Sequence, residues 1–127
     1  KRKTINMQPA GTQHIAEFYN CKSKVLDDDS HLKTILHNGI NHAGLKHVNI
    51  ISHKFSPIGV TVLAIISESH IAIHTYPETG HISIDIFTCS DSQKHKILLD
   101  YFEGIFQPHS TEVIELQRGK KIVLRQQ

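Results

Sequence analysis

The segment Ser67–Glu78 carries the side chains that are most able to do chemistry in this sequence. It holds hydroxyl groups, two imidazoles and two carboxylates within twelve residues, and Cys89 follows soon after. Ser69 beside a histidine is typical of a hydrolase, and Cys89 with His74 would make a thiol nucleophile. Neither interpretation has a supporting motif, since Gly-x-Ser-x-Gly is absent. The alternative is a polar turn between two strands, in which His70 either orients a site or faces the other side of its strand.

Apolar segments around these residues predict the strands that position them. Val60–Ser67 is almost wholly apolar, which is typical of a buried central strand. Ile71 and Ile73 alternate with other residues in a short strand, and 82–88 alternates between two distinct faces. Because polar residues at the end of a buried strand are held rigidly, we expect Ser67–Glu78 to lie in a cleft.

The remaining pattern predicts the other elements of the fold. Strands are expected over 11–19, 48–55 and 113–116, and helices over 32–43 and between Asp91 and Pro108. The apolar face of the second helix is expected to comprise Ile97, Leu98, Tyr101, Phe102, Ile105 and Phe106. This order of elements predicts an α+β two-layer sandwich, with a mostly antiparallel sheet and both helices on one face.

Length and composition limit the fold and its partners. The 127 residues, 39% of them hydrophobic, predict one small domain over 11–119 that gains from pairing with a second copy. Residues 1–10 are expected to form a flexible basic tail, and 120–127 a polar tail. A net charge of +2 without a basic stripe gives no support for nucleic-acid binding. No apolar run is long enough to predict a membrane span.

The two cysteines and eleven histidines do not form a disulfide or metal pattern. Cys21 and Cys89 lie far apart, and nothing else in the sequence indicates secretion. The histidines are mostly isolated, and Cys-x-x-Cys and His-Glu-x-x-His are absent. We therefore expect free cysteines in a cytoplasmic protein, with Cys21 packed in the interior, and no bound metal.

Two segments resemble the core motifs of a known enzyme family. Ser67–Glu78 has the sequence Ser-Glu-Ser-His-Ile-Ala-Ile-His-Thr-Tyr-Pro-Glu, and 85–89 has the sequence Asp-Ile-Phe-Thr-Cys. Both resemble the short, prokaryotic-type S-adenosylmethionine decarboxylases, and further similarity in 16–27 and 55–61 extends the match over 11–119. The resemblance implies a self-processing, pyruvoyl-dependent decarboxylase. Such an enzyme would act as a homodimer on a small, amino-acid-like substrate in polyamine synthesis.

The resemblance also implies how the cofactor would form. The Ser69 hydroxyl would attack the carbonyl of Glu68, and elimination from the resulting ester would convert Ser69 into a pyruvoyl group. His74 corresponds to the family's base for this elimination, and Thr61 stands where relatives often carry a serine that assists processing. Cys89 corresponds to the residue that returns a proton to the substrate carbon after decarboxylation.

The resemblance makes S-adenosylmethionine the expected substrate. Glu78 corresponds to an acid that binds the ribose hydroxyls, and Phe55 and Tyr76 are candidate contacts for the adenine or the sulfonium. Tyr76, Thr79 and Ser90 depart from residues that are common in the family. Decarboxylation of arginine or ornithine on the same scaffold is an alternative, because Glu78 would also pair with a guanidinium or ammonium group. A non-catalytic, partner-binding pseudoenzyme is a further alternative.

Overall fold

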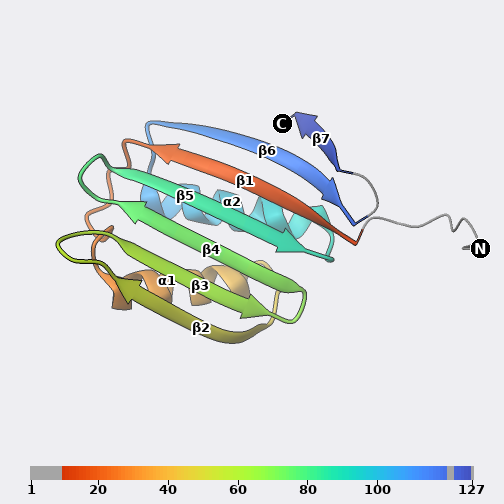
Figure 1. Cartoon of the computed structure of the whole chain (residues 1–127), viewed down its shortest axis with the longest axis horizontal. Helices are drawn as coiled ribbons and strands as arrows, with labels where there is room; N and C mark the ends of the chain where they lie inside the picture. Colours follow the sequence, from red (N-terminus) through yellow and green to blue (C-terminus); the bar gives the residue numbers. More distant parts are fainter. Residues whose placement is uncertain (1–9, 120–121, 127) are drawn as a thin grey trace, which may run out of the picture.

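Within residues 10–119 and 122–126, which the computed structural model describes, seven antiparallel strands form one sheet that two helices cover on one face (Figure 1). In chain order the elements are β1 (Gly11–Tyr19), α1 (Asp29–His42), β2 (His47–Lys54), β3 (Val60–Ile66), β4 (Ser69–Tyr76), β5 (His81–Thr88), α2 (Ser92–Phe106), β6 (Ser110–Arg118) and β7 (Val123–Gln126). The strands lie in the order β2-β3-β4-β5-β1-β6-β7. The predicted α+β two-layer sandwich is therefore confirmed.

The hydrophobic core lies between the sheet and the two helices. In β5, Ile82, Ile84 and Ile86 are buried against the helices, and the residues between them face the other way. The helices approach each other at Gly39, where a Cβ atom would come within 2.9 Å of Leu98. Because strand side chains alternate, this core also fixes which residues point away from the helices.

Both helices begin at an aspartate that accepts a backbone hydrogen bond. Asp28 caps α1, and Asp91 caps α2 by accepting from the backbone N–H of Gln93 at 2.9 Å. Only Cys89 and Ser90 lie between Thr88, the last residue of β5, and the capping residue Asp91. The position of Cys89 is thus set by both a strand end and a helix cap.

The face of the sheet opposite the helices, which Figure 1 shows toward the viewer, is covered by no other element of the described residues. It exposes Ile51 on β2, Ile65 on β3 and Ile114 on β6. We call it the open face. Large apolar side chains exposed on one face of a sheet are typical of a surface that another protein or a ligand covers.

The buried side of α2 differs from the prediction. Ile97 and Ile105 are 39% and 38% exposed, whereas His95 is fully buried. The buried residues of α2 are His95, Leu98, Leu99, Phe102 and Phe106, and the partly buried Tyr101 also packs against the core. The prediction is therefore confirmed for Leu98, Tyr101, Phe102 and Phe106 and wrong for Ile97 and Ile105, because a polar residue with buried partners takes one of the inward positions.

The two chain ends were expected to be tails. The segment 120–127 contains β7, which the pattern did not predict and which pairs with β6. Residues 1–9 lie outside the described residues. No helix in the described part of the chain is long and apolar enough to cross a membrane.

A pair of histidines lies inside this apolar core. Nδ1 of His14, on β1, is 2.8 Å from Nδ1 of His95, on α2. Burial lowers the pKa of both, and it lowers that of His95 to about 4, helped by charge repulsion from His14 and opposed by Glu115 and Asp91. Both imidazoles are therefore neutral at pH 7.

The depressed pKa of His95 predicts loss of stability in acid. Between pH 6.5 and 4 the unfolded histidine binds a proton that the folded one does not, so stability falls as the pH falls through this window. The free energy of unfolding should drop by about 2–3 kcal/mol from pH 7 to pH 4.5 through this residue alone. Urea unfolding of the Ser69→Ala chain, which lacks the hydroxyl expected to start self-cleavage, measures this drop at both pH values. His95→Gln should be clearly less sensitive to pH, and equal sensitivity of the two chains would contradict the assignment.

Candidate active site

The Glu68–Ser69 peptide bond lies in a tight turn between two paired strands. Ile66, the last residue of β3, pairs with Ser69, the first residue of β4, so Ser67 and Glu68 alone form the connection. Ser69 has a φ of 152°, a conformation that residues with a side chain rarely adopt. Such backbone strain costs of order 1–3 kcal/mol and is common at functional sites. The bond that the motif marks for cleavage is therefore held in a strained turn.

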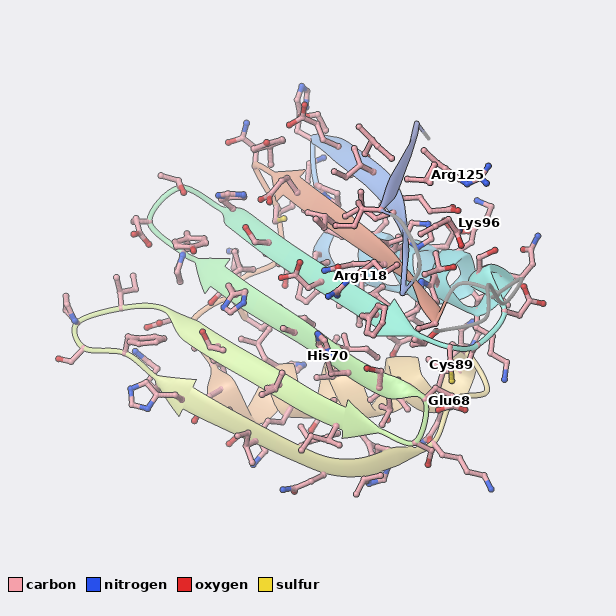
Figure 2. The ribbon with its side chains drawn as sticks, turned by 45° about the vertical axis from the view of Figure 1, so that its right-hand side comes forward. Glu68, His70, Cys89, Lys96, Arg118 and Arg125 are labelled. Carbon is pink, nitrogen blue, oxygen red and sulfur yellow. The ribbon has the colours of Figure 1, made fainter. Side chains whose placement is uncertain are left out.

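The carbonyl of this peptide bond is already hydrogen bonded to a strand end. The backbone N–H of Cys89 donates to the carbonyl oxygen of Glu68 at 3.1 Å. Figure 2 shows Glu68 and Cys89 together at the end of the sheet where β4 begins and β5 ends. A donor at this distance stabilises negative charge that develops on the oxygen when a nucleophile attacks the carbonyl carbon. The free thiol of Cys89 is exposed at the same place.

The side chain of Glu68 adds to the local cost of the uncut turn. Its Oε1 atom is buried and has no hydrogen-bond partner among the described residues. A buried polar atom without a partner costs about 1–3 kcal/mol. The strained φ of Ser69 and this orphaned oxygen lie on the two sides of one peptide bond. The φ of Ser69 is a torsion of the continuous chain, so its strain would be relieved if that bond were cut.

His70 is the histidine beside the Ser69 hydroxyl. Its Nδ1 lies 3.5 Å from Ser69 Oγ, which is the long limit of a hydrogen bond. The ring of His70 lies 5.9 Å from that of Phe87, and the guanidinium of Arg118 lies 4.5 Å from the Phe87 ring centre. Figure 2 shows His70 and Arg118 on the open face. The structure therefore places His70 toward the site rather than toward the core.

Thr61 and His74 form a second polar group on the open face. They are direct partners in the pairing of β3 with β4, and Thr61 Oγ1 lies 3.0 Å from His74 Nδ1. A neutral imidazole held through Nδ1 keeps a fixed ring orientation and leaves Nε2 to act as a base. The threonine hydroxyl thus orients His74.

A cavity of about 570 Å³ opens beside this pair. Its lining includes the three predicted substrate-binding residues, Phe55, Tyr76 and Glu78. It also includes the predicted catalytic residues Thr61 and His74. The turn between β2 and β3 forms one wall of the cavity. The segment before α1 holds this turn in place, because Asp27 Oδ1 accepts a hydrogen bond from the backbone N–H of Gly59 at 2.7 Å. Contacts with Gly59 and Lys54 lower the pKa of Asp27 and keep it ionised. The cavity is therefore built on fixed backbone.

Tyr76 is held by residues that the sequence did not single out. The ring of His81 stacks between those of Tyr76 and Tyr19, with centroids 5.2 Å and 5.1 Å away. His81 Nε2 lies 2.5 Å from a Glu17 carboxylate oxygen, which also accepts from the Ser83 hydroxyl. Glu17 and Ser83 are direct partners in the pairing of β1 with β5. Knowledge of that pairing, which the sequence pattern alone does not supply, would have found this cluster.

The predicted site residues form two separate groups within one chain. Glu68, Ser69 and Cys89 lie at one end of the sheet, whereas Thr61 and His74 line the cavity. Ser69 and His74 are on the same strand, and five residues of extended chain span about 16 Å. His74 of the same chain is therefore too far from Ser69 to remove a proton there.

Cys21 has a different environment from Cys89. It packs against the hydrophobic core, and burial raises the pKa of its thiol to about 11. A thiol of this kind stays protonated and unreactive. The expectation that Cys21 is packed is confirmed.

A small sandwich whose motif serine lies in a strained turn, with an amide donor on the preceding carbonyl, has the features of a self-processing enzyme. The chain belongs to the S-adenosylmethionine decarboxylase family, whose sequence model matches residues 12–119. This family consists of pyruvoyl-dependent carboxy-lyases. The predicted resemblance to this family is confirmed.

Individual relatives support the same assignment. The chain is 39% identical over 113 residues to the S-adenosylmethionine decarboxylase proenzyme of Methanococcus maripaludis, covering 89% of this chain and 93% of that protein. It is 47% identical over 81 residues to the proenzyme of Synechococcus sp. WH7803, covering 64% and 63% of the two chains. The crystal structure of the adenosylmethionine decarboxylase from Aquifex aeolicus matches with a TM-score of 0.84 at 26% identity, covering 91% of this chain and 95% of that one.

The strain at Ser69 predicts an unusual order of stability in two chains that lack the Ser69 hydroxyl. Glycine adopts a φ of 152° without steric cost, whereas alanine does not. The Ser69→Gly chain should therefore be more stable than the Ser69→Ala chain, by about 1 kcal/mol after the entropic cost of glycine. Thermal and urea unfolding of the two chains measure the difference. Ser67→Gly and Ser67→Ala are the matched control pair in the same turn, and there the alanine chain should be at least as stable as the glycine chain. If Ser69→Ala also proves at least as stable as Ser69→Gly, the strain at Ser69 is disproved.

Proposed function

We propose that this protein cuts its own chain between Glu68 and Ser69 and then decarboxylates S-adenosylmethionine with the pyruvoyl group that forms from Ser69. The observation that carries the proposal is the strained Glu68–Ser69 bond with the Cys89 amide on its carbonyl. The name "proenzyme" of its relatives agrees with self-cleavage in them. The residues present fit the cofactor, because the serine that would become the pyruvoyl group lies at a strained strand start.

The chain's own residues account for each step of the cleavage. Ser69 Oγ attacks the carbonyl carbon of Glu68, and the Cys89 N–H stabilises the charge that develops on the carbonyl oxygen. The C–N bond breaks, the nitrogen of residue 69 takes a proton, and an ester joins Glu68 to Ser69 Oγ. A base then removes the α-proton of residue 69, and the Glu68 carboxylate leaves. Addition of water and loss of ammonia convert the remaining group into pyruvoyl.

The finished site needs a proton donor as well as the cofactor. A pyruvoyl group supplies a carbonyl that condenses with a substrate amine and takes up the electron pair left by carbon dioxide. The substrate carbon must then receive a proton. The Cys89 thiol is exposed beside residue 69 and is the group that we assign to this step.

The separation of His74 from Ser69 leads us to propose a homodimer with shared sites. Two copies that face each other across their open faces would bury the exposed Ile51, Ile65 and Ile114. A two-fold axis would place Thr61 and His74 of the partner subunit opposite Ser69 and Cys89 of the first, and the reverse. The base for the elimination would then come from the other subunit, and each dimer would hold two sites.

The cavity next to His74 is the proposed binding site for the substrate. Phe55 and Tyr76 offer aromatic faces to an adenine or a sulfonium, and the Glu78 carboxylate would accept from ribose hydroxyls. Arginine and ornithine are the alternatives that Glu78 alone would allow, but the relatives are named for S-adenosylmethionine. We place the protein in the cytoplasm, where its free Cys21 and Cys89 fit a reducing compartment.

The proposal predicts two chains and one preferred substrate. Intact-mass measurement should show an upstream fragment ending at Glu68 and a downstream fragment that begins with pyruvoyl. Ser69→Ala should stay a single chain. The processed protein should release carbon dioxide from S-adenosylmethionine and not from arginine or ornithine at equal concentration. A stable, active, uncut chain would refute self-cleavage, and preference for arginine or ornithine would refute the substrate assignment.

The shared site predicts complementation between two inactive variants. Ser69→Ala and His74→Ala should each be inactive alone, because every site in either homodimer lacks one essential group. Co-expressed, they should form heterodimers in which one of the two sites is intact, giving roughly a quarter of parent activity at random pairing. Mixed Ser69→Ala and Cys89→Ala chains are the matched control. Ser69 and Cys89 of one site come from the same subunit. In this mixed dimer, one site therefore lacks Ser69 and the other lacks Cys89, and no complementation is expected.

Light scattering should show a dimer. A fully active monomer, or no complementation between Ser69→Ala and His74→Ala, would rule out the shared site.

A further inference from the structure

A chain of buried polar groups lies on the helix side of the sheet, behind Cys89, and takes no part in the steps above. Thr88 Oγ1 lies 2.5 Å from His95 Nε2, and the two histidines meet through their Nδ1 atoms at 2.8 Å. His14 Nε2 then lies 3.3 Å from Glu115 Oε1. Thr88 and His95 are fully buried, and His14 is 4% exposed. Three polar side chains at this depth are costly unless each is bonded.

The proton positions in this network follow from its two ends. The Glu115 carboxylate accepts, so Nε2 of neutral His14 carries the proton and its Nδ1 is bare. His95 must then donate from Nδ1 to His14, which leaves its own Nε2 to accept from the Thr88 hydroxyl. Thr88 Oγ1 in turn accepts from the backbone N–H of Ser90 at 3.1 Å. Every group is satisfied with both histidines neutral, and all the hydrogen bonds run in one direction.

The end of this network encloses Cys89. Thr88 and Ser90 are the residues on either side of it, and the bond from the Ser90 N–H to Thr88 Oγ1 closes the turn between them. The Thr88 side chain points into the helix layer, so it contacts neither the cavity nor the open face. On the opposite side of the turn, the Cys89 N–H donates to the Glu68 carbonyl. Thr88 is also the direct cross-strand partner of Ser69. The hydrogen bonds of its hydroxyl lead to the Glu68 carbonyl through the backbone of Ser90 and Cys89.

We propose that Thr88, His95 and His14 are positioning residues that hold the Cys89 amide and thiol in place for self-cleavage and for proton return. This inference deepens the proposed function and rests on it where the reaction is concerned. Small displacements of a group that stabilises charge reduce rates by one to two orders of magnitude. Loss of the Thr88 hydroxyl, with the shape of the side chain kept, should therefore slow self-cleavage about 10- to 100-fold.

The first test measures the turn directly in the uncleavable Ser69→Ala chain. Nitrogen-15 NMR should show the proton on Nδ1 of His95 and on Nε2 of His14. In Thr88→Val the Ser90 N–H and His95 Nε2 lose their partner, so hydrogen exchange at the Cys89 amide should speed up at least about tenfold. Thr88→Ser keeps the hydroxyl and should exchange within about threefold of its parent. Ile84→Val is the matched control, since it destabilises the same face of β5 without touching the turn.

The second test measures cleavage in otherwise native chains made by cell-free synthesis and followed by mass after a short pulse. Thr88→Val should cleave slowly, whereas Thr88→Ser and Ile84→Val should cleave near the parent rate. Unchanged Cys89 exchange in Thr88→Val, or equal slowing in Ile84→Val, would overturn the inference. If the parent chain does not cleave at all, the proposed function fails, and the exchange measurement still decides whether the network positions Cys89.

Discussion

The hydrogen bond from the Cys89 amide to the Glu68 carbonyl is the contact on which the reactive end of the molecule depends. It exists only because β4 and β5 pair in a register that sets Ser69 opposite Thr88. The isoleucines of both strands fix that register, since a slip by one residue would turn them out of the core. The geometry at the Glu68–Ser69 bond is therefore a consequence of hydrophobic packing several residues away.

The same alternation divides the work of the sheet between its two faces. In β4, Ile71 and Ile73 are buried under the helices, and His70 and His74 point to the open face. The predicted catalytic His74 thus occupies a position that the core does not need. An open sheet cannot enclose a substrate or exclude water, however, and its reactive groups are spread along strands. This constraint explains why a second copy is the natural complement of a single sheet.

The elements were predictable from the sequence because their signals are local, whereas the missed features depend on partners far along the chain. The alternation over 82–88 indicated β5, and the patterns over 32–43 and between Asp91 and Pro108 indicated α1 and α2. The His14–His95 contact joins residues 81 positions apart, and no periodicity marks it. The family resemblance identified Ser69 and His74 but gave no distance between them. Only their positions on β4 show that His74 cannot reach Ser69 of the same chain.

Cleavage at Glu68 would not release the upstream fragment, because the two fragments are interleaved in one sheet. The upstream part supplies β1, β2 and β3 with α1, and the downstream part supplies the other strands with α2. In the sheet β1 lies between β5 and β6, so an upstream strand is bonded on both edges to downstream strands. The helices of the two fragments also pack together at Gly39. The turn can therefore lose its strained bond while the rest of the fold keeps every strand partner, and the fold continues to hold the new chain start beside Cys89.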